Sequence, residues 1–330
     1  QILIRRCNTV MKKKLLCGLL SLVVLAGLLS GCAAGTAPAD ENIVDLGGLM
    51  DEAVPLAGAP AVSTLLAPVA SGASTAKNSS ATIDYSNAKD GYVMVNWTAG
   101  SAKLKVQVKG PSGTTYTYNL RSDGQYDTFP LSDGSGAYSV NVFKNISGTQ
   151  YSGVLAANIS AQLTDEFAPF IRPNQYVNYS ENSAVVRQAA AECQGITENL
   201  TKVEKIYNYV VNNLTYDTAK AKSVQSGYLP DVDAVMAAKT GICFDYAALM
   251  AAMLRSQGVP VKLVVGYTGN VYHAWLNVWS EKDGWVDNLI YFDGKVWKLM
   301  DPTFASSGKQ SASIMQYIGD GANYTAKYLY

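Results

Sequence analysis

The spacing of the apolar residues changes near residue 165, and this change constrains the fold more than any other feature of the chain. From about residue 81 to residue 163, apolar and polar residues alternate, as in YVMVNW, KLKVQVKG and AYSVNVF, which is the two-residue period of β-strands. Turn residues such as Pro111-Ser112-Gly113 and Ser122-Asp123-Gly124 interrupt this alternation. The segment is therefore predicted to form an antiparallel, immunoglobulin-like sandwich of about seven strands.

After a proline-containing connector, EFAPFIRPNQ, the period becomes helical. In ENLTKVEKIYNYVVNNL the apolar residues recur at intervals of three and four, which places them on one face of a helix. Shorter helices are predicted for DVDAVMAAK and for the segment from Cys243 to Gly258. Strands are predicted for VKLVVGY, VYHAWLNVW and VWKLMD, with an aromatic turn region between the last two. The expected fold class is α+β, an all-β sandwich followed by helices and an antiparallel sheet.

A signal peptide is predicted near the start of the chain. Met11 is followed by Lys12-Lys13-Lys14, an apolar stretch that ends at Leu29, and the sequence Leu29-Ser30-Gly31-Cys32. This ending resembles a bacterial lipobox, and the resemblance implies that Cys32 becomes the mature N-terminus and carries lipid. An uncleaved transmembrane helix is the alternative, but the apolar run is shorter than the ~20 residues that cross a bilayer. The expected location is the extracytoplasmic face of the cell membrane, through a lipid anchor.

These patterns divide the chain into four parts. Residues 1–31 are the predicted signal peptide, in which residues 1–10 are interpreted as an over-extended reading frame. Residues 32–79 are rich in Ala, Gly, Ser and Pro and are predicted to be a lipid anchor and flexible tether, because such a composition lacks large apolar side chains. Residues 80–165 form the predicted β-sandwich, a spacer or a module that binds peptide or cell wall. Residues 166–330 form the candidate catalytic domain.

The charge composition argues against a nucleic-acid partner. The chain has 26 basic and 26 acidic residues, and residues 1–31 contain Arg5, Arg6, Lys12, Lys13 and Lys14 but no acid. Without that segment, 21 basic residues face 26 acidic residues. A mildly acidic chain is not suited to bind a phosphate backbone or to form a polybasic membrane patch.

The small number of histidines and cysteines argues against a zinc site and a disulfide scaffold. Cys7, Cys17 and Cys32 lie in the leader or anchor, so Cys193 and Cys243 are the two cysteines of the folded part. A disulfide between these two is possible but would leave Cys243 without a free thiol. Cys193 lies in the helical segment AAAECQ and is expected to be a buried, apolar residue. With one histidine and no Asp-rich loop in the sequence, neither zinc nor calcium is expected, and no cofactor is predicted.

Cys243 and His273 together point to thiol chemistry. A cysteine nucleophile needs a base, and His273 is the one histidine of the chain. Cys243 follows Gly241-Ile242 at the predicted start of a helix, where N–H groups and the helix dipole should lower the pKa of the thiol. Asp301 ends the strand VWKLMD and could orient the imidazole. Taken singly, these residues could also be a core thiol, a strand histidine and a turn aspartate.

Four segments resemble the transglutaminase-like superfamily, which has a papain-like fold. They are TGICFDYA, LRSQGVP, YHAW and WKLMDPT, and the resemblance covers about residues 198–305. It implies that Cys243 is the nucleophile, His273 the base and acid, and Asp301 the orienting carboxylate. It also implies an upstream side chain in the oxyanion hole, for which Tyr216 and Tyr228 are weak candidates. Trp275 and Trp285 are expected to pack or to line a cleft.

The expected function is an extracytoplasmic thiol enzyme that attacks amide or peptide bonds through a Cys243 thioester. Water as the acceptor would make the protein a cysteine peptidase or amidase, whereas a lysine amine would make it a crosslinking transglutaminase. Hydrolysis is slightly favoured, and the expected partner is a protein or peptide substrate, with cell-wall peptide as one candidate. The alternative is a non-catalytic surface binding lipoprotein that retains the fold.

Overall fold

The computed structural model describes residues 65–268, 271–292, 297–299 and 324–330. The predicted signal peptide, the predicted lipidation residue Cys32 and the candidate carboxylate Asp301 lie outside these residues. Within the described part of the chain, none of the helices combines the length and the apolar character that a membrane span requires.

Two four-stranded antiparallel sheets form the first part of the described chain. One has the strand order β1-β2-β3-β6 and the other the order β5-β4-β7-β8. Alternate residues of the second sheet, such as Val106 and Val108, are buried between polar neighbours, as expected for strands with one face in a core. The strands predicted from alternation are confirmed, although there are eight of them: β1 Thr75–Lys77, β2 Ala81–Asp84, β3 Tyr92–Trp97, β4 Leu104–Lys109, β5 Thr115–Leu120, β6 Asp127–Pro130, β7 Gly136–Ser147 and β8 Gln150–Ala161.

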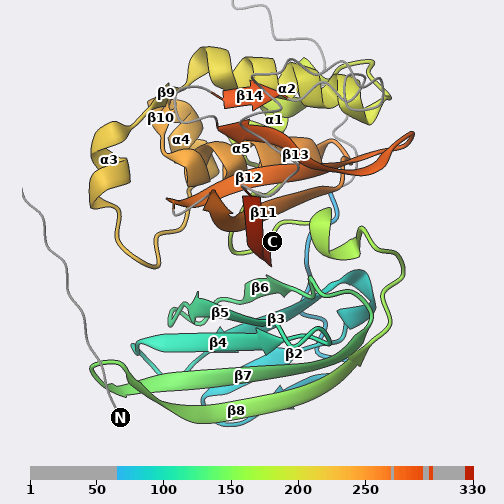
Figure 1. The fold of residues 1–330 in the computed structure, drawn as a ribbon. Coiled ribbons are helices and arrows are strands. Elements are labelled where there is room, and N and C mark those ends of the chain that lie inside the picture. The colour runs from blue at the N-terminus through green and yellow to red at the C-terminus, as the bar shows by residue number, and fades with distance from the viewer. Residues whose placement is uncertain (1–64, 269–270, 293–296, 300–323) are drawn as a thin grey trace, which may run out of the picture. The chain divides into compact units, whose positions relative to one another are not determined.

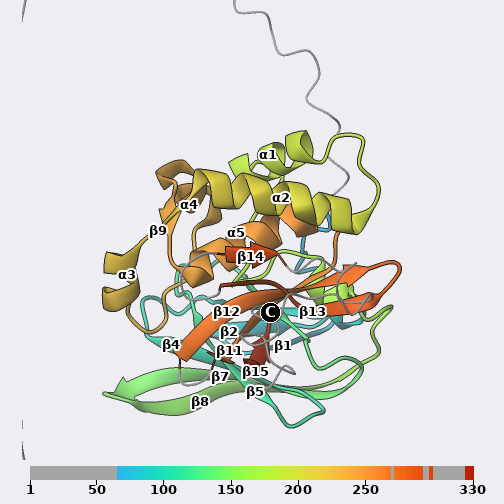
Figure 2. The ribbon, with the colours of Figure 1, turned by 45° about the horizontal axis from the view of Figure 1, so that its top comes forward.

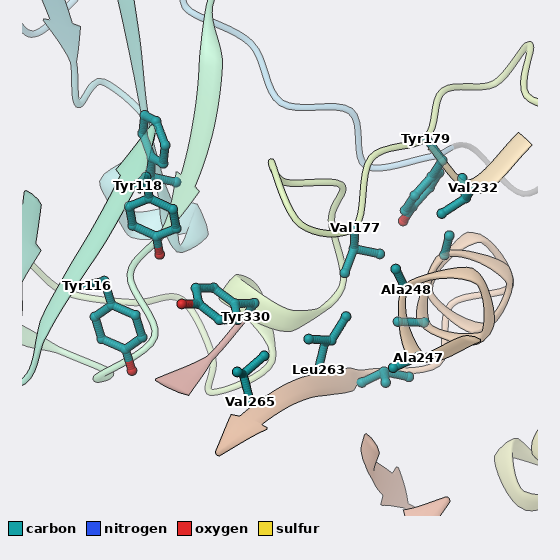
Figure 3. Packing of buried hydrophobic residues seen from close by; sticks show 14 of the residues in the cluster. Tyr116, Tyr118, Val177, Tyr179, Val232, Ala247, Ala248, Leu263, Val265 and Tyr330 are labelled. Atoms are coloured by element: carbon teal, nitrogen blue, oxygen red, sulfur yellow. The ribbon is translucent and has the colours of Figure 1, made fainter. Parts of the chain in front are cut away.

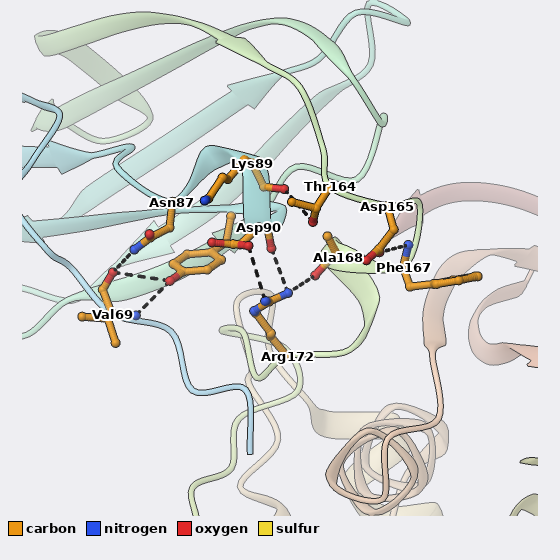
Figure 4. A network of polar contacts seen from close by, with 10 residues as sticks. Val69, Asn87, Lys89, Asp90, Thr164, Asp165, Phe167, Ala168 and Arg172 are labelled. Carbon is orange, nitrogen blue, oxygen red and sulfur yellow. Dashed lines mark hydrogen bonds and ion pairs between the residues drawn. The ribbon is translucent and has the colours of Figure 1, made fainter. Parts of the chain in front are cut away.

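The connector that follows the sheets is fixed to them by polar contacts. A short 3-10 helix η1 (Ala88–Asp90) lies beside a second one, η2 (Ala168–Phe170). Arg172 donates hydrogen bonds from Nη1 to the carbonyls of Asp90 (3.0 Å) and Ala168 (3.1 Å), and its Nη2 lies 3.7 Å from the Asp90 carboxylate (Figure 4). Thr164 N–H donates to the Lys89 carbonyl at 2.8 Å. The direction in which the chain leaves the two sheets is therefore set by specific bonds.

Five helices come next, and the three predicted ones are confirmed. They are α1 Ala184–Glu192, α2 Asn199–Asn213, α3 Thr218–Ser223, α4 Val232–Ala238 and α5 Cys243–Ser256. Helix α5 is built mainly from Ala, Leu and Met, which are strong helix formers, and its residues from 245 to 256 are all buried. A helix that is apolar on all sides belongs in the centre of a domain. Helices α1, α2 and α4 each pack against α5.

A five-stranded antiparallel sheet with the order β14-β13-β12-β11-β15 completes the described chain. Helix α5 packs on β11 and β12, and α1, α2 and α4 lie on the same side of the sheet (Figures 1 and 2). The strands are β11 Val261–Thr268, β12 Val271–Ser280, β13 Gly284–Phe292, β14 Trp297–Leu299 and β15 Tyr324–Leu329. The predicted aromatic turn region is wrong, because residues 284–292 form β13 and pair with β12. Strand β15, which pairs with β11, was not predicted from the sequence.

One hydrophobic cluster runs through the two four-stranded sheets and the helix–sheet layer. Tyr330 lies at the junction: its ring stacks on Tyr176 with centroids 4.0 Å apart and meets Tyr116 and Tyr118 edge-on at 5.8 Å. Figure 3 shows Tyr330 between these two tyrosines of β5 and Val265 of β11. Its backbone N–H and carbonyl both bond to Leu263. The two-sheet part and the helix–sheet layer therefore share an apolar contact. Separating them would expose this apolar surface to water, which is unfavourable.

Candidate functional site

A two-stranded parallel ladder positions Tyr216 beside the residues that precede Cys243. Strand β9 (Thr215–Tyr216) pairs with β10 (Thr240–Gly241), so that Tyr216 lies opposite Gly241. Helix α4 ends at Ala238, and the capping residue Lys239, whose φ of 53° is left-handed, turns the chain into β10. The Asp217 N–H donates to the Gly241 carbonyl at 2.9 Å. A tyrosine far upstream in sequence is thus held next to the start of α5.

The buried carboxylate of Asp245 caps the helix that Cys243 begins. The Ile242 N–H donates to Asp245 Oδ2 at 2.8 Å, which satisfies one of the donors that a helix start leaves unpaired. A side chain at position 241 could not fit, because a Cβ built on Gly241 would lie 2.6 Å from the Asp245 Cβ. The Gly-Ile-Cys-Phe-Asp sequence therefore fixes the orientation of the first turn of α5. The predicted helix-start position of Cys243 is confirmed.

Lys220 and Tyr228 complete the surroundings of this carboxylate. Lys220 Nζ lies 2.6 Å from Asp245 Oδ2 and 2.7 Å from the Tyr228 hydroxyl, which in turn donates to Asp245 Oδ1 at 2.5 Å. Asp245 is fully buried, and the Lys220 side chain is 29% exposed. The three side chains link α3 and the loop after it to the start of α5. Charged groups that leave water need such partners.

Cys243 and His273 line one cavity of about 830 Å³, which lies within the size range of ligand sites. Its walls come from β4 and β5, the connector, the segment from β9 through α3 and the loop after it, the start of α5, and β11, β12 and the C-terminal strand of the five-stranded sheet. Aromatic side chains form much of the surface between them. The lining residues are Lys105, Thr117, Asn119, Tyr176, Tyr216, Ala221, Val224, Gln225, Ser226, Gly227, Tyr228, Ile242, Cys243, Phe244, Val265, Tyr272, His273, Ala274, Tyr328 and Tyr330.

Burial raises the pKa of the Cys243 thiol, so the expected lowering is wrong. Removing the thiolate from water costs more than the helix start returns, and the nearby charge of Asp245 acts in the same direction. The N–H groups of Ala274 and Phe244 and the side chain of Tyr216 bond to the sulfur and partly offset the effect. The resting residue is therefore a thiol that three donors are placed to stabilise once it is deprotonated.

His273 is presented from β12, opposite Gly266 of β11, and it is 8% exposed. Burial lowers the pKa of its imidazole to about 4. The ring is then neutral near pH 7, which is the form that can accept a proton from a thiol. Because Ala274, the next residue, bonds to the Cys243 sulfur, the structure brings the two predicted residues together. Their catalytic roles, and that of Asp301, stay predictions.

Tyr216 is the better placed of the two upstream tyrosines. The backbone N–H of Cys243 bonds to the Tyr216 hydroxyl oxygen, and this hydroxyl also contacts the Cys243 sulfur. An oxyanion that forms on a carbonyl bound at the sulfur would lie next to both donors. Tyr228 is instead engaged by Asp245 and Lys220. No spacing rule in the sequence distinguishes the two tyrosines, since the β9–β10 pairing that selects Tyr216 is non-local.

Three further predictions concern structural residues. Cys193 is 6% exposed and forms no disulfide, and burial raises the pKa of its thiol to about 11, which confirms it as a core residue. Trp275 is fully buried. Trp285 packs against Phe167 and donates from Nε1 to Glu166 at 3.0 Å. Neither tryptophan lines the cavity, so both have packing roles. Within the described residues no group of His, Cys, Asp and Glu side chains could hold a metal ion.

The site thus combines a cysteine at the start of a buried helix with a strand histidine in the same cavity lining, and backbone N–H groups bond to the cysteine sulfur. Residues 187–288 match the model of the transglutaminase-like superfamily. This part of the chain is therefore a transglutaminase-like core, as the four sequence segments predicted. The matched residues contain both Cys243 and His273.

Individual relatives share only part of the chain. A protein-glutamine gamma-glutamyltransferase of Pseudomonas aeruginosa is 32% identical over 62 residues, a match that spans 14% of this chain and 9% of that protein. A candidate cysteine protease from Cytophaga hutchinsonii aligns at 14% identity over 78% of this chain and 73% of its own, with a TM-score of 0.36. Red sea bream transglutaminase aligns at 11% identity over 64% and 48%, with a TM-score of 0.28. At these TM-scores the alignments do not define a common fold for the whole chain.

Proposed function

We propose that the protein is a thiol acyl-transfer enzyme that cleaves amide bonds through a thioester on Cys243. The observation that carries the proposal is that Cys243 and His273 line one cavity, with the Ala274 N–H bonded to the cysteine sulfur. A thiol and a neutral imidazole in one cavity are the minimum that nucleophilic catalysis of this kind requires. The match to the transglutaminase-like family supports the same chemistry.

The first half of the reaction uses groups that surround the sulfur. As His273 accepts the thiol proton, the sulfur adds to the amide carbonyl and the negative charge moves to the carbonyl oxygen. The Cys243 N–H and the Tyr216 hydroxyl lie where they can donate to this oxygen. When the tetrahedral intermediate collapses, the C–N bond breaks, the amine leaves with the proton from His273, and a thioester remains.

We propose hydrolysis as the second half of the reaction. Water adds to the thioester carbonyl while His273 takes one of its protons. The C–S bond then breaks, the sulfur regains a proton, and a carboxylic acid leaves. A lysine amine could replace water, but the positive charge of Lys105 in the cavity wall repels an ammonium acceptor, so water is favoured.

We further propose that the enzyme is exported and held at the membrane surface by a lipid anchor. The segment that ends at Cys32 supports an exported, lipid-anchored protein, and the paired sheets of residues 75–161 then fit an immunoglobulin-like module between anchor and catalytic core. Intact-mass and fragment analysis of protein from the membrane fraction tests the anchor. Lipid on Cys32 agrees with the proposal, and a soluble product with unmodified Cys32 contradicts it.

Selective alkylation tests the catalytic part and separates it from the rival binding function. In wild-type protein, iodoacetamide at pH 7–8 should modify Cys243 much faster than Cys193. Cys243 is only partly buried and shares the cavity lining with its proposed base His273, whereas Cys193 is buried and its thiol has a pKa of about 11. The His273→Ala variant should lose most of this difference because the thiol loses its base. Equal, slow modification of the two cysteines in native protein would favour a binding module that retains the fold without the reaction.

A further inference from the structure

The wall of the catalytic cavity that faces away from the helix–sheet layer belongs to the sandwich. Lys105 of β4 and Thr117 and Asn119 of β5 contribute side chains to the lining. They project from the polar outer face of that sheet, where Lys105 lies opposite Asn119 and Gln107 lies opposite Thr117 in the strand register. The loop after α3 approaches the same place, since a Cβ built on Gly227 would lie 2.5 Å from the Asn119 side-chain nitrogen. The sandwich is therefore part of the reaction chamber.

Lys105 gives this wall a positive charge. Among the described lining residues it is the one Lys or Arg, and none of them is Asp or Glu. The Lys105 ammonium donates to Asn119 Oδ1 at 2.5 Å, and none of the ion pairs found among the described residues involves it. An ammonium has three N–H donors, so it can still bond to a ligand. The Asn119 amide nitrogen is a second donor in the same wall.

Aromatic rings form much of the remaining cavity lining. Tyr176, Phe244, Tyr272, Tyr328 and Tyr330 all contribute to the surface, and Tyr272 is 55% exposed. Rings of this kind give broad apolar contact to an extended chain while their hydroxyls remain able to bond. A ligand that fills the cavity would thus meet the thiol at one position, aromatic surface along its length, and a positive charge at the sandwich wall.

We infer that Lys105, with Asn119 beside it, binds a carboxylate of the substrate, so that the enzyme selects amides of acidic peptides. This inference rests on the proposed thiol chemistry and adds a substrate class to it. The carboxylate is either an acidic side chain or a free peptide C-terminus, since both offer the same two oxygens to the ammonium. The sandwich is then the specificity element of the enzyme.

The test measures how fast Cys243 reacts with paired electrophilic peptides. Full-length protein is treated with chloroacetyl-(Gly)n-Glu-amide and with its neutral counterpart, chloroacetyl-(Gly)n-Gln-amide, with one to three glycines as spacers. A third probe, chloroacetyl-(Gly)n-Gln with a free C-terminus, distinguishes a terminal carboxylate from a side-chain carboxylate. Intact mass and peptide mapping give the rate at Cys243 for each probe. At one or more spacer lengths, an acidic probe should react about three- to tenfold faster than the neutral probe.

Two substitutions and one control assign the preference to Lys105. Lys105→Gln should reduce the ratio of acidic to neutral rates to about one, and Lys105→Glu should bring it below one. Lys109→Gln removes an equal charge from an exposed residue further along β4, outside the cavity lining, and should keep the wild-type ratio. A ratio of one at every spacer length in wild-type protein, or a preference that survives Lys105→Gln, overturns the inference.

Iodoacetamide separates failure of this inference from failure of the proposed function. If Cys243 reacts readily with iodoacetamide but the peptides show no charge preference, the thiol chemistry stands and the role of Lys105 is wrong. The role of Lys105 is also wrong if no chloroacetyl peptide reacts and the acetyl-capped Glu and Gln peptides protect Cys243 from iodoacetamide equally. If Cys243 is inert to iodoacetamide in the native protein, both proposals are overturned.

Discussion

Lys220 Nζ lies 2.6 Å from the carboxylate of Asp245, a fully buried residue two positions after the candidate nucleophile. The same carboxylate accepts the Ile242 N–H at the start of α5. The position of Cys243 is therefore linked, through one buried charge, to a lysine on the neighbouring helix α3. An ion pair next to the candidate nucleophile has consequences for stability that can be measured without a substrate.

Lys220→Met should destabilise the fold by about 2–3 kcal/mol, because Asp245 would keep its charge in the interior without its cationic partner. The expected loss is below the ~3–5 kcal/mol of a fully buried pair, since Lys220 is 29% exposed. Lys222→Met, an exposed lysine of the same helix, is the control and should change stability by less than about 0.5 kcal/mol. Urea unfolding measures both variants. Equal stabilities would show that the pair does not support the start of α5.

His273 should titrate far below an ordinary histidine. Its pKa is lowered to about 4 by burial, whereas the pKa of the same histidine in the unfolded chain is near 6.5. Between these pH values the unfolded chain binds a proton that the folded chain does not bind. Stability from this residue is full above about pH 6.5 and falls as the pH drops towards 4. Because the sequence has one histidine, proton NMR of tag-free protein follows a single pair of imidazole resonances. A midpoint at or above 6.5 would show that a carboxylate, such as Asp301, outweighs burial.

A shorter chain that begins at Asn174 should not fold into a stable catalytic domain. The change of sequence period near residue 165 alone would suggest that the β-sheet part and the catalytic part are separable. The shorter chain would expose Tyr176 and Tyr330, which now pack against Tyr116 and Tyr118. It would also lose the 2.6 Å bond from Ser132 to the Leu329 carbonyl. The expected product binds a hydrophobic dye and melts without cooperativity. A cooperative transition like that of the longer chain would contradict the shared core.

Tyr216→Phe should slow acyl-enzyme formation with p-nitrophenyl acetate by about 10²-fold, because one donor to the developing oxyanion is lost. Alkylation by iodoacetamide passes through no such oxyanion and should change much less. Tyr228→Phe is the matched comparison: its hydroxyl bonds to Asp245 and Lys220, so it should affect stability more than acylation. If the two reactions slow equally in Tyr216→Phe, its hydroxyl acts on the thiol and not on the oxyanion.

The sequence predicts local elements well and long-range pairings poorly. Alternation and helical spacing located most strands, three helices and the Cys243 helix start, since each depends on neighbouring residues. Strand β15 lies beside β11 in the sheet, although β12, β13 and β14 come between them in the chain. No local sequence pattern predicts such a pairing. The raised pKa of Cys243 also follows from tertiary burial, which the helix-start argument does not contain. The sequence analysis also missed Lys105 as a cavity residue, because its place in the lining depends on packing between distant parts of the chain.

The central claim is that Cys243 and His273 act as one unit, and acyl-enzyme formation tests it most directly. Wild-type protein treated with p-nitrophenyl acetate should gain one acetyl group on Cys243. Cys243→Ala and His273→Ala should each lose this product, and the double variant should be no worse than either, because residues of one unit lose activity non-additively. Asp301→Asn should be milder, since nucleophile and base remain. Acylation or turnover by Cys243→Ala at the wild-type rate would contradict the account.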